Sequence, residues 1–138
     1  KNKIYEEIKC TNFRELVSSC SSRFGNNTAF TVKDKNKKLH DISFIDFENN
    51  IKELGSSLLD LGLENKKVAI ISQDRYEWCC SYLAITTAGC IVVPLDFMLP
   101  EVEQLRLIVE SKVDAIIFDE KRLKLAKDVI GENGLQRF

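Results

Sequence analysis

The sequence predicts an α/β fold, a partial doubly wound parallel sheet of βαβαβ type over residues 67–119, preceded by a helix, a β-hairpin and a long amphipathic helix. Three short apolar runs rich in β-branched residues, at 67–72, 90–94 and 114–118, are typical of strands covered on both faces. The segments between these runs are each long enough for a helix. Strands joined by such crossovers are parallel, and the connections are right-handed.

The first predicted helix spans residues 13–24. Asn12 is a typical N-cap residue, and Glu15 stands at the third helical position. Apolar residues then recur at helical spacing, so we expect the helix to lay one apolar stripe on a core. The stripe consists of Phe13, Leu16, Val17, Cys20 and Phe24.

A polar turn at residues 34–37 lies between two short extended runs, residues 28–33 and 38–42, and this pattern predicts a β-hairpin. The single histidine, His40, falls in the second run. We interpret it as a surface residue, because the sequence shows neither a second metal ligand nor a carboxylate partner for it.

The long amphipathic helix is predicted over residues 43–62, with Ser43 as its cap, Asp46 at the capping-box position and Gly62 at its end. Its apolar residues alternate at steps of three and four: Phe44, Phe47, Ile51, Leu54, Leu58 and Leu61. A coiled coil is the alternative, but the run is too short for sustained heptads and residues 55–57 weaken its middle. We therefore expect this helix to pack on the sheet.

The helix after the first core strand is predicted to be capped by Asp74, with Glu77 at the capping-box position, and to end at Gly89. Between residues 76 and 88 only Glu77 is charged. A helix that is apolar nearly all round expects cover on both sides. We therefore expect this chain, when isolated, to expose an apolar patch or a sheet edge and to self-associate. The alternative is that the helix that begins at Phe13 or the one that begins at Phe44 already covers Trp78 and Tyr82.

A further helix is predicted to begin near Pro100, with acidic residues in its first turn and Lys112 in its last turn, as the helix dipole favours. Its expected buried stripe consists of Val102, Leu105, Ile108 and Val109. After the third strand, we expect a charged helix over residues 120–130 and a turn at residues 131–134.

Composition limits the classes of function. The 138 residues carry a net charge of -1, which gives no reason to expect nucleic acid or an anionic membrane as a partner. No apolar run has the length of a membrane span, and we expect a cytoplasmic protein. The five cysteines show no metal-binding spacing and are interpreted as small buried apolar residues: Cys10, Cys20, Cys79, Cys80 and Cys90.

Ligands of open parallel sheets bind beyond the carboxyl ends of the strands, which here are residues 72–75, 95–99 and 119–121. In a functional interpretation Asp74, Arg75 or Asp96 lines a substrate or partner surface. The alternative, which we favour, is that Asp74 is a helix cap and the others are solvated loop charges. The sequence contains no phosphate-binding loop, dinucleotide fingerprint, nucleophile elbow or zinc-protease motif.

Residues 68–94 resemble the early part of the acyl-adenylate-forming enzymes. The likeness includes the helix start Asp74-Arg-Tyr-Glu-Trp78, the pair Ala88-Gly89 and the sequence Val93-Pro-Leu-Asp96, and it extends over residues 13–118. Arg75-Tyr-Glu-Trp78 and Leu99-Pro-Glu101 with Glu103 look most like the long-chain fatty acyl-CoA synthetases.

The resemblance implies an AMP-forming acid–thiol ligase that uses ATP, Mg²⁺ and coenzyme A. In such an enzyme a carboxylate attacks the α-phosphorus of ATP, and a thiol then displaces AMP. The family's phosphate loop and catalytic lysine match no position here, so we assign no catalytic, cofactor-binding or metal-binding residue and expect the chain alone to be inactive.

Residues 1–138 are then expected to be a single domain, the N-terminal fragment of a larger ligase domain. Its parts would be a helix and hairpin at 12–42, a helix at 43–62 and the parallel core at 67–119. Its partners would be the remainder of its own polypeptide and a fatty acid or another carboxylic acid. The resemblance leaves open which acid is used, whether coenzyme A or a carrier protein accepts the acyl group, and whether Phe138 is the natural C-terminus.

A different class of function stays open. A small doubly wound domain with Asp96 and Asp119 after successive strands is also compatible with a non-catalytic regulatory or interaction module. Such a module should carry an acidic cluster at the tip of its first strand, where this chain has Ser72 and Gln73 before a single aspartate.

Overall fold

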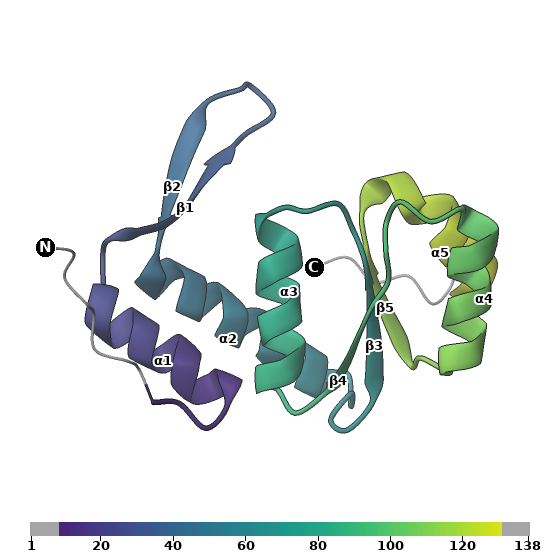
Figure 1. The fold of residues 1–138 in the computed structure, drawn as a ribbon, viewed down its shortest axis with the longest axis horizontal. Helices are drawn as coiled ribbons and strands as arrows, with labels where there is room; N and C mark the ends of the chain where they lie inside the picture. The colour runs from purple at the N-terminus through teal and green to yellow at the C-terminus, as the bar shows by residue number, and fades with distance from the viewer. Residues whose placement is uncertain (1–8, 131–138) are drawn as a thin grey trace, which may run out of the picture. The chain divides into compact units, whose positions relative to one another are not determined.

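Strand β3 (Lys67–Ile71) is the centre of a three-stranded parallel sheet in the computed structural model, which describes residues 9–130 (Figure 1). It pairs with β4 (Ile91–Pro94) on one side and with β5 (Ala115–Phe118) on the other. The parallel βαβαβ unit is therefore confirmed. Only β3 is buried along nearly its whole length, because the two outer strands each have one neighbour, and Ile91 of β4 is 50% exposed.

Helices cover both faces of this sheet, because successive residues of a strand point to opposite sides. Val68 and Ile70 face a cluster built with the end of α2 (Phe44–Asp60) and with α3 (Tyr76–Thr87). Ala69 and Ile71 face a second cluster, built with α4 (Glu101–Ser111) and α5 (Leu123–Ile130). The doubly wound arrangement predicted from the sequence is thus present.

The chain forms two compact units, residues 1–49 and residues 50–138, and the sheet belongs to the second. The first unit contains α1 (Phe13–Phe24), the antiparallel strands β1 (Thr28–Lys33) and β2 (Leu39–Ser43), and the start of α2. The predicted helix and hairpin are confirmed.

Local signals fix the ends of α1 and α2. The Glu15 N–H donates to the Asn12 side chain at 2.9 Å, so the predicted cap of α1 is confirmed. Ser43 Oγ accepts the Asp46 N–H at 3.0 Å, which confirms the cap of α2. The end at Gly62 is confirmed as well, since this residue adopts φ 72°, a conformation that favours glycine.

The apolar stripe of α1 is less covered than predicted. Phe13 is 45% exposed, Leu16 and Phe24 are each 37% exposed, and the buried residue of this helix is Ser21. Phe24 does pack against Phe44 of α2, with ring centroids 5.0 Å apart. A short helix, a hairpin and the start of α2 supply too little apolar surface to close a core over the stripe.

The start of α3 also differs from the prediction. Asp74 does not cap this helix, because Arg75 occupies the N-cap position with extended backbone and makes no side-chain cap bond. The carboxylate of Glu77 binds the Arg75 guanidinium, so it does not complete a capping box. At the other end, Gly89 adopts φ 79° directly after Ala88, as predicted for a glycine that ends a helix.

The predicted buried stripe of α4 is wrong except for Ile108, which is 3% exposed. Val102 is 77% exposed and Val109 is 65% exposed, whereas the amide residue Gln104 is fully buried. The helix is rotated toward Gln104 because that side chain bonds the backbone carbonyls of Asp96 and Phe97, at 2.9 and 3.2 Å. A buried glutamine without these bonds would leave unpaired polar atoms, which cost about 1–3 kcal/mol each.

Large exposed apolar side chains lie on α1, β2, α2, β4 and α4. On α3, by contrast, Trp78 and Tyr82 stack on each other and pack against the first cluster. Self-association of the isolated chain stays a prediction.

The segment after β5 begins differently from the prediction. The segment predicted as a charged helix forms a 3₁₀ turn, η1 (Glu120–Arg122), followed by α5, and the turn predicted at 131–134 lies outside the described residues. None of the five cysteines forms a disulfide bond. Cys80 and Cys90 are buried as predicted, whereas the other three are only partly buried.

Candidate functional site

A small pocket of about 170 Å³ opens at the carboxyl ends of β3 and β5. Its polar lining comes from Ser72, Arg75, Glu77, Ser81, Asp119 and Glu120. Ile70 and Ile117 form its apolar floor together with Trp78. The pocket therefore lies where an open parallel sheet presents its ligand-binding edge.

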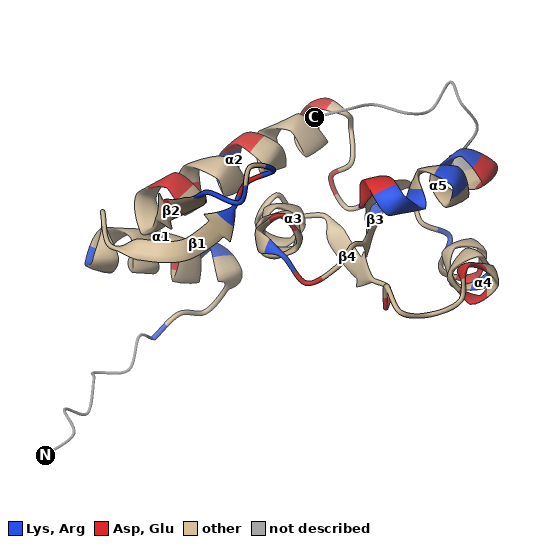
Figure 2. Ribbon diagram, turned by 90° about the horizontal axis from the view of Figure 1, so that it is seen from above, with Lys and Arg blue, Asp and Glu red and all other residues tan. Residues whose placement is uncertain are grey.

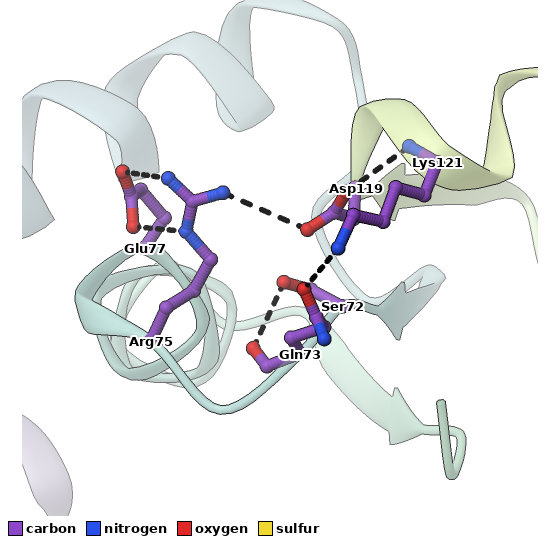
Figure 3. Close-up of polar contacts among 6 residues, drawn as sticks. All are labelled: Ser72, Gln73, Arg75, Glu77, Asp119 and Lys121. Atoms are coloured by element: carbon purple, nitrogen blue, oxygen red, sulfur yellow. Dashed lines mark hydrogen bonds and ion pairs between the residues drawn. The ribbon is translucent and has the colours of Figure 1, made fainter. Parts of the chain in front are cut away.

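Arg75 lies between two carboxylates in this pocket (Figure 3). Its Nε and Nη2 atoms donate to the two oxygens of Glu77 at 2.6 and 2.7 Å, and Nη1 lies 3.6 Å from Asp119 Oδ2. The bonds from Arg75 lower the pKa of Glu77, and those to Glu77 raise the pKa of Arg75. A forked guanidinium–carboxylate pair of this kind fixes the orientation of both side chains.

Asp119 anchors the other side of the pocket, and its side chain is only 6% exposed. Its Oδ1 atom accepts the backbone N–H of Lys121 at 3.0 Å, which caps η1. The ammonium of Lys121 in turn donates to Gln73 Oε1 at 2.8 Å (Figure 3). An ion pair between Arg75 and Asp119 and a hydrogen bond between Lys121 and Gln73 therefore hold the loop after β3 against the loop after β5.

The pocket does not fit ATP or Mg²⁺. The positive charge of Arg75 is already matched by two carboxylates, and Glu120 adds a third acid to the lining, so a polyphosphate meets no free cation. Among residues 9–130 no three histidine, cysteine or acidic side chains are placed to hold a metal ion. The arrangement joins the loop after β3 to the loop after β5.

Of the three residues singled out in the sequence, only Arg75 lines the pocket. Asp74 is exposed, and Asp96 is exposed with its Oδ1 atom accepting the Met98 N–H at 2.8 Å. Asp96 follows β4, and the strand order β4-β3-β5 places β4 on the far side of β3 from β5. The interpretation of Asp96 as a solvated loop charge agrees with this geometry.

His40 is exposed, as predicted, but the expectation that it has no carboxylate partner is wrong. Its Nε2 atom lies 2.8 Å from Asp34 Oδ2. The hairpin brings the two together, because the turn between β1 and β2 reverses the chain over a few residues. The proximity of His40 also lowers the pKa of Asp34.

Sequence reasoning missed a second polar cluster, formed by Gln104, Arg122 and the backbone of the loop after β4. Arg122 Nε donates to Gln104 Oε1 at 2.9 Å, and Arg122 Nη2 donates to the Phe97 carbonyl at 2.8 Å. The guanidinium also lies over the Phe97 ring, 4.1 Å from its centroid. The signal in the sequence that could have revealed this cluster is Gln104, an amide residue within an apolar helical pattern.

The Arg75–Glu77 pair makes one stability prediction that depends on pH. The folded pKa of Glu77 lies below its ordinary value of 4.5, so the pair stabilises the fold above that value and loses this contribution as pH falls through the lowered pKa. We expect the difference in unfolding free energy between wild type and Glu77→Gln to shrink over that acid range. Urea unfolding at low salt measures it, and a constant difference would contradict the assignment. The effect is small, because the Glu77 side chain is 59% exposed.

No helix within the described part of the chain is long and apolar enough to cross a membrane. Figure 2 shows basic and acidic residues interspersed along the chain, and the turn between β1 and β2 is rich in lysine.

The fold matches solved structures of ligases. It aligns with coronafacic acid ligase from Pectobacterium brasiliense at a TM-score of 0.75 and 26% identity, covering 87% of this chain and 23% of that one. It aligns with the anthranilate CoA ligase AuaEII in complex with anthranoyl-AMP at a TM-score of 0.74 and 21% identity, covering 87% of this chain and 22% of that one.

In sequence, the chain is 29% identical over 111 residues to the polyketide synthase–nonribosomal peptide synthetase phmA of Phaeosphaeria nodorum, a match that covers 80% of this chain and 3% of that protein. The chain thus spans less than a quarter of either solved ligase and a small part of the curated relative. The sequence profile of the AMP-binding enzyme family matches residues 18–136, so the chain belongs to the AMP-binding enzyme family.

Proposed function

We propose that residues 1–138 are the N-terminal part of one larger ligase domain, in an AMP-forming acid–thiol ligase of the long-chain fatty acid–CoA ligase type. The observation that carries this proposal is the family match over residues 18–136. The parallel sheet with helices on both faces supports it, since solved ligases contain the same arrangement. ATP, Mg²⁺ and coenzyme A would be held by other parts of the full-length protein.

In this proposal the described residues serve as scaffold. In the pocket at the tips of β3 and β5, Arg75 is paired with Glu77 and Asp119, and the residues that surround the pocket join loops. We place the protein in the cytoplasm, a proposal that rests on five free cysteines, since free thiols are usual in reducing compartments.

A second candidate is an adenylation unit within a multidomain synthetase. The relative from Phaeosphaeria nodorum is named as a polyketide synthase–nonribosomal peptide synthetase, and it shares 29% identity over 80% of this chain. Under this candidate the acid would differ from a long-chain fatty acid, and a carrier protein would replace coenzyme A as the acceptor.

Two measurements on the full-length protein separate the candidates. The first is ATP–pyrophosphate exchange with a panel of fatty acids of increasing chain length and a matched panel of amino acids. The second is thioester formation with coenzyme A as the only thiol. Exchange with long-chain acids followed by thioester formation would support the first candidate. Exchange confined to amino acids, or an adenylate that coenzyme A does not consume, would overturn it in favour of the second.

Residues 1–138 alone are expected to show no ATP–pyrophosphate exchange with any acid of the panel. Adenylyl transfer requires from a protein mainly that it positions the reactants and stabilises charge. This chain lacks the phosphate loop that would do so. The full-length protein assayed in parallel is the control. Turnover by the isolated chain above background would refute the view that it is scaffold.

A further inference from the structure

The turn between β1 and β2 carries a concentrated positive charge. Lys33, Lys35, Lys37 and Lys38 fall within six residues and are all exposed, and Leu39 beside them is 64% exposed. In Figure 2 much of this turn is blue, interrupted by short red and tan stretches. We call residues 33–39 the lysine turn.

The charge of the lysine turn is not neutralised within the described part of the chain. Its single acid, Asp34, is used by the turn itself, because Oδ1 accepts the N–H groups of Asn36 and Lys38, each at 2.8 Å, and Oδ2 contacts His40. None of the four lysine side chains forms an ion pair among residues 9–130. The nearest further acid on the hairpin, Asp41, accepts a hydrogen bond from Thr31 Oγ1 at 2.6 Å.

The net charge of the whole chain conceals this local excess. Residues 33–38 hold four lysines and one aspartate, whereas the rest of the chain holds sixteen basic and twenty acidic residues. A net charge of -1 therefore gives no information on an anionic partner, and the expectation drawn from it in the sequence does not apply to this surface.

The lysine turn is also held in one shape. The Asp34 N–H donates to the Lys38 carbonyl at 2.9 Å, and the Lys37 N–H donates to the Asp34 carbonyl at 3.0 Å. Behind the turn, Phe30 of β1 packs edge-on against Phe47 of α2, with ring centroids 4.8 Å apart. A fixed turn presents its charges at a smaller entropic cost than a flexible tail does.

We propose that the lysine turn is a docking site for a membrane surface that contains anionic lipids. Clustered lysines beside an exposed aliphatic side chain match such a surface, where the ammonium groups meet the headgroups and the leucine reaches the acyl boundary. A nucleic acid is the poorer partner, because the turn contains neither an arginine, which grips a phosphate with two bonds, nor an aromatic ring on which a base could stack.

The test measures binding of the full-length protein to vesicles, by co-sedimentation. One vesicle set contains phosphatidylcholine alone and the other contains phosphatidylcholine with phosphatidylserine. We expect binding to the anionic set only, weakened by salt. The double variant Lys35→Gln/Lys38→Gln should bind roughly thirtyfold more weakly, because each lysine near an anionic surface contributes about a fivefold gain.

Two matched variants make the result specific. Lys35→Arg/Lys38→Arg keeps the charge and should bind as wild type does. Lys66→Gln/Lys124→Gln makes the same change in net charge at exposed residues outside the hairpin and should also bind as wild type does.

Each of three outcomes would overturn the proposal: equal binding to neutral and anionic vesicles, unchanged binding by Lys35→Gln/Lys38→Gln, or retention by an RNA oligonucleotide without retention by vesicles. The assay contains no substrate, so its result is independent of the proposed reaction.

Discussion

Replacing Gln104 with leucine is expected to lower the free energy of unfolding by about 1–3 kcal/mol, although leucine has nearly the same volume. The Gln104 side chain is fully buried and makes three hydrogen bonds, to the carbonyls of Asp96 and Phe97 and to the Nε of Arg122. Phe97 keeps a donor from Arg122 Nη2 after the change. The Asp96 carbonyl keeps the Leu99 N–H at 3.3 Å, whereas Arg122 Nε would lose its acceptor in a largely buried cluster.

Urea unfolding of wild type and variant measures this loss. Gln73→Leu is the matched control, because Gln73 is exposed and makes a single side-chain bond, to Lys121. We expect that control to change stability by less than about 0.5 kcal/mol. If Gln104→Leu behaved like the control, the buried cluster of Gln104 and Arg122 would not hold the loop after β4.

Gly89→Val is expected to cost about 2 kcal/mol of stability, because a β-branched residue is strongly disfavoured in the left-handed region. Gly89 has φ 79°, and a Cβ atom built there meets no atom within 4 Å. The cost would therefore come from backbone conformation and not from a clash. The control is Gly89→Asn, since asparagine tolerates this region and should cost clearly less.

Both variants are compared with wild type by their urea midpoints. Equal loss in the two variants would contradict a conformational origin, and no loss in Gly89→Val would show that the end of α3 does not require this backbone geometry.

Local signals in the sequence predicted most element boundaries. Asn12 and Ser43 cap their helices as expected, because a cap depends on atoms within three residues of chain. The prediction for Asp74 was wrong because Arg75 occupies the N-cap position and Glu77 binds the Arg75 guanidinium, and a propensity pattern does not represent such a pair.

Contacts between distant residues were beyond such reasoning. The sequence identified the strand tips at Arg75 and Asp119, yet their approach to 3.6 Å depends on β5 lying beside β3. The buried face of α4 was missed for the same reason, because Gln104 is placed by Arg122, eighteen residues away. An apolar pattern treats glutamine as a surface residue unless its partner is known.

Strand β3 is a shared wall between two apolar clusters. Val68 and Ile70 belong to one cluster and Ala69 and Ile71 to the other, and all four side chains are at most 1% exposed. Loss of either helical layer would expose one face of the strand on which the other layer packs, so each layer stabilises the strand for the other. We therefore expect the two layers to unfold together, and the β3 amides to exchange with solvent more slowly than those of the two outer strands.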